Sequence, residues 1–223
     1  MQVLTLIESL TDGELSQLAL ADIGTKDSRN DTQIKNLDRL INFVNQGVLE
    51  LYKEFPIKVD IDTAFILQPS TTDNTIDLPE TALYLMKITK EDGTEVPTDD
   101  YDIAYKYKQG IYKDVYVKTV AINKYMVLGV VPESGINLQF HYTSAPDSLR
   151  ASSMLPLPVA YEDAIMLFVS YKAYSTTRSV TPAGDEGIVY KKKYGEAVEK
   201  LKDKFDLTYD WADPNRLRQK GFV

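Results

Sequence analysis

The sequence contains no cysteine and a single histidine, His141. The absence of cysteine excludes disulfides, zinc fingers, iron–sulfur clusters and thiol catalysis. With one histidine, a metal site would need oxygen ligands alone, and no Asp-x-Asp-x-Asp-Gly calcium loop occurs in the chain. We therefore expect no metal and no cofactor. A lone histidine on an alternating strand is typical of an exposed or hydrogen-bonded side chain, not of a catalyst.

Motifs for phosphate binding and nucleophilic catalysis are absent as well. The chain has no glycine-rich Rossmann or P-loop pattern and no Gly-x-Ser-x-Gly elbow. Two groups of carboxylates remain, Asp60 with Asp62, and Asp99 with Asp100 and Asp102. Paired carboxylates can hydrolyse glycosides, so an acidic-site hydrolase built on the second group stays open as an alternative. Solvated acidic loops explain these residues better, and we predict that the protein is not an enzyme.

Basic residues are outnumbered, and long apolar runs are missing. The chain has 33 acidic and 25 basic residues and a net charge of −8, a balance that opposes tight binding of nucleic acid. Screening limits such fields to about 8–10 Å, so a local basic patch is compatible with this balance. No stretch approaches the roughly 20 apolar residues of a membrane span. The first residues lack the basic leader of a secretory signal, and the lack of cysteine suits a reducing cytoplasm.

Hydrophobic periodicity predicts one long helix in the first quarter of the chain and another near its end. Between residues 31 and 55, apolar side chains recur at spacings of three and four, which places them on one face of a helix that Pro56 ends. Asp31 or Thr32 is the predicted N-cap. The stretch 190–205 has the same periodicity.

A shorter helix is predicted closer to the N-terminus. Thr11 and Asp12 precede Glu14 in a capping pattern that follows an amphipathic turn at 3–10. The apolar residues of this helix are Leu15, Leu18 and Leu20.

Between residues 57 and 143 the apolar period changes to two, which is typical of half-buried strands. Strong turn signals, such as the one at 91–94, separate the strands. The first strand is predicted from the alternation of Ile57, Val59, Ile61, Phe65 and Leu67. The same alternation predicts a strand that carries Tyr101, Ile103, Tyr105 and Tyr107. We expect this region to form a β meander or a small barrel.

These elements together predict an α+β fold with a discontinuous helical domain. Residues 1–56 and 147–205 would form a helical bundle, and residues 57–146 an antiparallel β insertion between its two halves. Residues 206–223 show no clear period and would form an extended C-terminal arm.

The stretch 155–175 is apolar almost all round. Pro156 and Pro158 fix the backbone before it, so a helix should begin near Val159. Such a helix must be wrapped by other elements of the chain or by neighbouring subunits, and the pattern allows both. The candidate subunit-interface residues are Tyr161, Ile165, Phe168, Tyr171 and Tyr174.

The C-terminal arm combines bulky apolar side chains with positive charge in an acidic protein. A frayed end is one interpretation, and a peptide that orders against a partner is the other. Aromatic and arginine side chains carry much of the energy of protein interfaces, which favours docking. The candidate docking residues are Tyr209, Trp211, Arg216, Leu217, Arg218, Lys220 and Phe222.

The order of elements and two local motifs resemble the adaptor, or tail tubular, ring proteins that connect head and tail in short-tailed bacteriophages. The stretch 155–175 combines a prolyl lead-in, a Tyr-x-Asp-Ala turn and an aromatic helix ending in Ala-Tyr-Ser. The stretch 14–24 is similar to the first helix of that family and its glycine stop. The β region matches by type, without a shared motif.

The resemblance implies a structural virion protein that forms a ring, typically of twelve copies, below the portal of a DNA-filled capsid. The implied partners are sister subunits, the portal protein, a downstream tail or second ring protein, and double-stranded DNA that passes through the channel without sequence-specific binding. No membrane is involved, and the protein would act in the virion neck after assembly in the host bacterial cytoplasm. The arm would contact the portal, and Glu91, Asp92 and Glu95 would face the tail.

Another virion role remains open beside this one. In a tail-hub or tube component, the β insertion would make the main contacts, and the C-terminal arm would contribute little.

Overall fold

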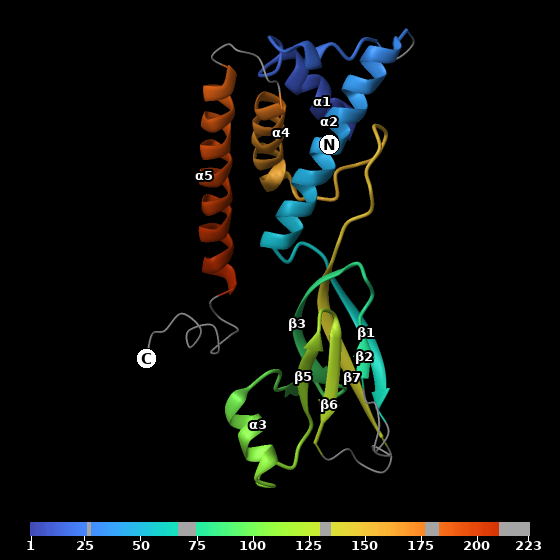
Figure 1. Ribbon diagram of the computed structural model, residues 1–223, viewed down its shortest axis with the longest axis vertical. Helices are drawn as coiled ribbons and strands as arrows, with labels where there is room; N and C mark the ends of the chain where they lie inside the picture. Colours follow the sequence, from blue (N-terminus) through green and yellow to red (C-terminus); the bar gives the residue numbers. More distant parts are fainter. Residues whose placement is uncertain (26–27, 67–74, 130–134, 177–182, 210–223) are drawn as a thin grey trace. The chain divides into compact units, whose positions relative to one another are not determined.

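The computed structural model describes residues 1–25, 28–66, 75–129, 135–176 and 183–209. The fold is α+β, as the sequence predicts, and the chain divides into a helical unit and a β unit (Figure 1). The helical unit takes residues 1–51 and 146–223, and the β unit takes residues 52–145.

The first helix of the helical unit, α1, spans Val3–Asp12. It buries Val3, Leu6, Ile7 and Leu10, whose spacing of three and four places them on one face. Gly13 ends the helix, and the Leu15 N–H donates back to the Leu10 carbonyl at 2.8 Å.

The helix predicted after Thr11 is therefore wrong. The chain turns after Gly13, and within the stretch 14–24 that resembled a first helix only the short 3₁₀ helix η1, Ala19–Ala21, is regular. The capping pattern misled because Glu14 is engaged elsewhere: its carboxylate accepts a hydrogen bond from Ser170.

The long helix α2 spans Asp31–Glu54 and is closed at its start by a reciprocal cap. The Gln33 N–H donates to Asn30 Oδ1 at 2.9 Å, and the Asn30 N–H donates to Gln33 Oε1 at 3.0 Å. The N-cap is thus Asn30, one residue before Asp31 and two before Thr32, the predicted positions. Pro56 follows the helix, as expected.

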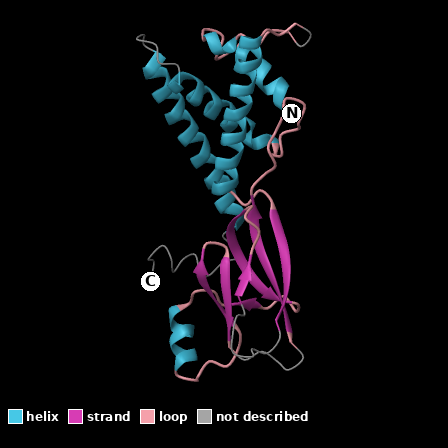
Figure 2. Ribbon diagram, turned by 45° about the vertical axis from the view of Figure 1, so that its right-hand side comes forward, coloured by secondary structure: helices cyan, strands magenta, loops and turns pink. Residues whose placement is uncertain are grey.

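The β unit consists of two antiparallel sheets, coloured magenta in Figure 2. The four-stranded sheet has the order β1-β7-β3-β4. Its strands are β1 (Val59–Ile66), β7 (Ile136–Ser144), β3 (Ala82–Lys90) and β4 (Glu95–Val96). The three-stranded sheet has the order β2-β6-β5 and consists of β2 (Thr75–Asp77), β6 (Lys124–Leu128) and β5 (Tyr116–Ala121). Because β7 pairs with β1 and β3, the expected meander is wrong. The expected barrel is wrong as well, because the described strands divide into two separate sheets.

One hydrophobic cluster holds the β unit together. Alternate residues of the central strand β7 contribute to this cluster, together with residues of β3, β5 and β6. The other residues of β7 point to the opposite face of the sheet, since side chains alternate along a strand. The buried members of the cluster are Ile66, Leu78, Ala82, Ile88, Val96, Val115, Val117, Tyr125, Val127, Leu138, Phe140 and Tyr142.

The strand predicted around Tyr101 is also wrong, because helix α3, Tyr101–Lys108, occupies this stretch. Asp100 caps it: the Ile103 N–H donates to Asp100 Oδ1 at 3.0 Å, and the Ala104 N–H donates to the Asp100 carbonyl at 2.9 Å. The period-two alternation of tyrosines did not reveal this cap. The helix buries little, so local capping rather than packing selects its conformation.

Candidate interaction surfaces

The aromatic helix begins where the two prolines predict. A 3₁₀ turn, η2 (Val159–Tyr161), follows Pro158 and leads directly into α4, Glu162–Thr176. The first turn of α4 carries two carboxylates, Glu162 and Asp163, which interact favourably with the positive end of the helix dipole.

Helix α4 packs closely against α2 at a glycine. A Cβ atom at Gly47 would lie 2.8 Å from Cδ1 of Phe168 and 3.2 Å from Cδ1 of Ile165. Glycine at this position therefore lets the two helices approach each other, with the Phe168 ring lying over the α2 backbone.

Helix α5, Ala183–Tyr209, covers another side of α4 through aromatic contacts. The Tyr174 and Tyr190 rings are stacked with centroids 5.3 Å apart, and Phe168 meets Tyr194 edge to face at 5.2 Å. Where the helices begin their contact, Gly187 lies next to Ser175. Tyrosine is favoured along this seam because it combines a large contact area with a polar tip.

Two buried hydroxyl groups of α4 are satisfied by the segment after α1. The Tyr174 hydroxyl donates to the Glu14 carbonyl oxygen at 2.7 Å, and Ser170 Oγ donates to Glu14 Oε2 at 3.0 Å. Burial, reinforced by the nearby Glu186 carboxylate, raises the pKa of Tyr174 to about 12. Burial alone raises the pKa of Tyr161 to about 12. Both phenols are therefore neutral over the physiological pH range.

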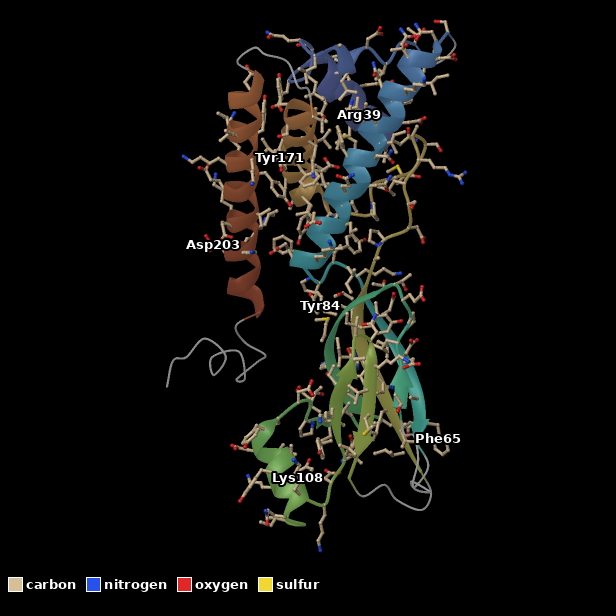
Figure 3. All side chains as sticks on the ribbon, viewed as in Figure 1. Arg39, Phe65, Tyr84, Lys108, Tyr171 and Asp203 are labelled. Carbon is tan, nitrogen blue, oxygen red and sulfur yellow. The ribbon has the colours of Figure 1, made fainter. Side chains whose placement is uncertain are left out.

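Four of the five predicted subunit-interface residues are core residues of their own chain. Tyr161, Ile165, Phe168 and Tyr174 are buried. Tyr171 is half-buried at the α4–α5 seam (Figure 3), where the amino groups of Lys172 and Lys191 lie 5.5 and 6.0 Å from its ring centroid. Of the two interpretations of the all-round apolar pattern, wrapping by the chain itself accounts for these four side chains.

The predicted tail-facing residues lie at an exposed hairpin turn between β3 and β4. The Thr94 N–H donates to Asp92 Oδ1 at 2.8 Å, which lowers the pKa of Asp92. Glu91 accepts a hydrogen bond from Asn137 at 2.6 Å, and Glu95 is exposed. Two of these three carboxylates thus have a structural role in the turn or beside it.

Two of the three carboxylates considered for hydrolysis, Asp99 and Asp100, have structural partners. Asp99 accepts hydrogen bonds from the Thr119 N–H, at 2.8 Å, and from its hydroxyl, and Asp100 caps α3. His141 forms a 3.0 Å hydrogen bond with Thr89 Oγ1, and burial lowers its pKa. The histidine is thus hydrogen-bonded, as predicted.

Sequence reasoning missed a surface at the edge strand β1. Val59, Ile61 and Phe65 are 42%, 54% and 58% exposed, although strand alternation usually turns apolar residues inward. The intervening carboxylates occupy the core side instead: Tyr142 donates to Asp62 Oδ2 at 3.1 Å, and Ser144 donates to Asp60. The two aspartates were visible in the sequence, but nothing in the alternation says which face is inward.

A hollow of about 270 Å³ lies between α3 and β5 on another side of the β unit. The α3 side carries Tyr101 and Tyr105, which are 82% and 57% exposed. Lys108 and Lys118 line the hollow together with the carboxylates Asp99 and Asp100. Sequence reasoning missed this hollow because it assigned the tyrosines to a strand.

The remaining predicted site lies mostly outside the described residues. Helix α5 continues to Tyr209, so the first residues assigned to the arm are helical. Residues 210–223, which carry the other candidate docking residues, are not among those described. No helix in the described ranges has the length and apolar content to cross a membrane. Across those same ranges, no three histidine, aspartate or glutamate side chains gather where they could hold a metal ion.

Comparison with known proteins identifies the family. The family model described as "SU10 adaptor protein" matches residues 11–218, which include nearly all of both units. A search of curated proteins finds no match. The matched range covers the aromatic seam, the β unit and most of the arm. The chain therefore belongs to the SU10 adaptor protein family and is a structural head-to-tail adaptor protein of a bacteriophage.

Proposed function

We propose that this adaptor forms a ring that docks below the portal, joins the capsid to the tail and forms part of the channel for DNA. The family match over residues 11–218 is the observation that carries this proposal. A closed ring needs one heterologous contact, repeated between successive copies. The copy number, which the resemblance puts at twelve, is part of the proposal.

The composition supports a channel role and a docking role in different parts of the chain. A net charge of −8 gives a surface to which phosphates would not adhere, so DNA could slide past it. The sequence of the arm contains Trp211, Phe222, Arg216 and Arg218, and these residue types are common at the centre of protein interfaces. The proposed site of action is the neck of the virion, after assembly in the bacterial cytoplasm.

Binding to purified portal protein of the same phage tests this proposal. We expect the intact chain to assemble on the portal as a ring visible by electron microscopy. A chain that stays monomeric and unbound in the presence of the portal overturns the proposal.

Removal of residues 210–223 tests the arm separately. The truncated chain keeps the β unit and the whole of α5, so we expect its fold to be unchanged. Its circular dichroism spectrum should match that of the intact chain in shape. We expect portal binding to be lost, and a milder variant with Trp211→Ser and Phe222→Ser should weaken it. Undiminished portal binding by the truncated chain would show that the docking surface lies elsewhere.

Charge reversal at the β3–β4 turn tests the tail-facing surface. Glu95→Lys is the most direct variant, because the Glu95 side chain is exposed and, among the described residues, accepts no hydrogen bond in the turn, unlike that of Asp92. We expect portal binding to persist while attachment of the next tail component weakens. If this charge reversal disrupts attachment while removal of residues 210–223 does little, a tail-hub or tube role is favoured, in which the β unit makes the principal contact.

A further inference from the structure

Strand β1 has an open edge that lacks the usual protections. Among the described residues its one neighbour is β7, which it pairs without a register shift from Val59↔Thr143 to Ile66↔Ile136. Proteins protect an exposed edge with a short strand, a bulge, a proline or a lysine. The eight residues of β1 contain no bulge, no proline and no cation. The backbone groups along this edge are therefore open to a further strand.

The two faces of β1 differ in chemistry, because side chains alternate along a strand. The outer face carries Val59, Ile61 and Phe65, all exposed (Phe65 is labelled in Figure 3). The opposite face carries Asp60 and Asp62, which discourage pairing with an uncharged or acidic strand. A complementary strand therefore has cations at every second position and uncharged side chains between them.

Asp62 is the carboxylate that has no charged partner. Asp60 has the Lys58 amino group at 3.3 Å and accepts a hydrogen bond from Ser144. Asp62 is exposed and accepts a hydrogen bond from the neutral Tyr142 hydroxyl at 3.1 Å. No cation lies within 4 Å of Asp62 in the part of the chain that the structure describes. A cation on an added strand would thus neutralise a charge that is still unpaired.

Cations at every second position occur in four places in the sequence. Three of these places lie inside helices α3 and α5, at 106 and 108, at 191 and 193, and at 200, 202 and 204. The fourth place is in the C-terminal arm, where Arg216, Arg218 and Lys220 alternate with Leu217, Gln219 and Gly221. The arm therefore combines the cations and the uncharged residues that an added strand needs, in the order that it needs them.

We propose that residues 215–222 of the arm add to the open edge of β1 as a parallel strand, with Arg218 beside Asp62. On the carboxylate face, this register places opposite charges next to each other, a pairing that stabilises neighbouring strands. On the outer face, it places Leu217 beside Ile61, so that two apolar side chains share contact area. Both faces of β1 are thus matched at once by the alternation of the arm.

The apolar residues determine the direction of the added strand. Charges alone allow both directions, because the cations of the arm are spaced evenly around Arg218. A parallel strand places Gly221 beside Phe65, where the lack of a side chain leaves room for the ring. An antiparallel strand with the same central charge pair would place the polar Gln219 beside Ile61. The parallel direction is therefore the better match.

The same arm residues are proposed above to dock on the portal. One segment cannot form both contacts at once, so portal docking should release β1. This release rests on the proposed function, whereas the strand itself does not. The consequence is an order of assembly, in which the edge of β1 becomes available only after the arm has engaged the portal.

Disulfide trapping in the intact chain tests the strand and its register, since the sequence has no cysteine. Thr63→Cys with Gln219→Cys places two thiols side by side in the proposed strand, within the separation of about 7 Å between Cα atoms that a disulfide allows. We expect this pair to link in a glutathione redox buffer without portal protein. Thr63→Cys with Leu217→Cys is the matched control and should link about tenfold more slowly, because it is two residues out of register.

Mixing the two single variants, Thr63→Cys and Gln219→Cys, shows which copy supplies the strand. Linked dimers in the mixture identify a neighbouring copy, and a link confined to the double variant identifies the same copy. Both results support the strand. Absence of a link in every pair overturns it, and faster linking through Leu217→Cys overturns the parallel register.

Portal protein added to the double variant separates this inference from the proposed function. We expect the rate of linking to fall as portal binds. An intact chain that binds portal but never links leaves the proposed function standing and overturns the strand. A chain that links but does not bind portal has the reverse meaning, and linking that bound portal leaves unchanged overturns the release.

Removal of one charge gives a second measurement. Asp62→Asn keeps an acceptor for the Tyr142 hydroxyl and removes the charge, so the fold of the β unit should be kept. We expect the rate of linking to fall about two- to fivefold at low salt, with a smaller change at high salt. Asp102→Asn, an exposed position on α3, is the matched control and should leave the rate unchanged. Equal rates in both variants would exclude the proposed charge pair.

Hydrogen exchange tests the strand without any cysteine. In the intact chain without portal, the amides of β1 that do not bond to β7 should exchange more slowly than in the chain truncated after Tyr209. The amides of β6, which lie in the other sheet, should exchange equally in both chains. Equal exchange of β1 in the two chains would overturn the added strand.

Discussion

The close approach of α2 and α4 allows a test in which the same substitution has opposite effects at two helical glycines. At Gly47, a methyl group would lie 2.8 Å from Cδ1 of Phe168. At Gly195, on α5, nothing lies within 4 Å of the added atom. Both positions are inside helices, so the gain in helix propensity from glycine to alanine is similar, about 1 kcal/mol.

Whether Gly47→Ala stabilises or destabilises the helical unit depends on whether the Phe168 ring can move away from the added methyl group. Its ring meets Tyr171 and Tyr194 edge to face at 6.0 and 5.2 Å, so other aromatic rings hold it in place. Overpacking of this kind costs about 1–3 kcal/mol, which outweighs the propensity gain. We expect Gly47→Ala to destabilise the helical unit by about 1 kcal/mol. Gly195→Ala should stabilise it by about 0.5–1 kcal/mol.

Thermal unfolding followed by far-ultraviolet circular dichroism measures the difference. The signal reports chiefly on the helical unit, where all but one of the α-helices of the described chain lie. The two variants should melt roughly 8 °C apart, with the wild type between them. A Gly47→Ala variant as stable as Gly195→Ala would refute the reasoning, because it would show that Phe168 yields without cost.

Three further predictions concern single groups. Tyr174→Phe should destabilise the helical unit by about 1–2 kcal/mol in urea unfolding, because it leaves the Glu14 carbonyl without its 2.7 Å donor. Burial raises the pKa of Tyr161 and of Tyr174 from 10 to about 12, so the fold favours the neutral phenols. These groups should leave stability unchanged below pH 10, and stability should fall between pH 10 and about 12. Thermal melts at a series of pH values check this, and the fall should be smaller in each Tyr→Phe variant. Asp100→Ala should cost about 1 kcal/mol locally by removing the cap at the Ile103 N–H, seen as faster hydrogen exchange confined to α3.

Strong periodicity with clear end signals predicted helices α2 and α4. Helix α2 followed from its apolar stripe and from Pro56, and α4 followed from the two prolines before Val159. In both cases a rigid local signal coincides with tertiary packing, so sequence and fold agree.

Local signals failed where a short segment had more than one conformation open to it. Around Tyr101 the alternation suggests a strand, yet one capping aspartate and exposure to solvent select a helix. After Thr11 the capping pattern was present, but the polar group of Glu14 was used by Ser170, which lies 156 residues later in the chain. Long-range partners of this kind are not visible in a single sequence.

The candidate surfaces show the same division. The sequence identified α4 as a helix that must be covered, but only the packing of α2 and α5 shows that the chain itself covers Ile165 and Phe168. Tyr171, with two lysines around its ring, is the one predicted residue of that helix that keeps substantial exposure.

Strand β1 shows why alternation alone could not have located an interaction surface. A period of two assigns residues to two faces, and the usual assumption turns the apolar face inward. In β1 that assumption fails, because Tyr142 and Ser144 offer hydroxyl donors on the core side and so hold Asp62 and Asp60 there. Once those two bonds are made, the register leaves Phe65 and its apolar neighbours no inward position. The exposed apolar face of β1 therefore follows from polar satisfaction inside the β unit, and its cost in water is relieved if another surface covers it.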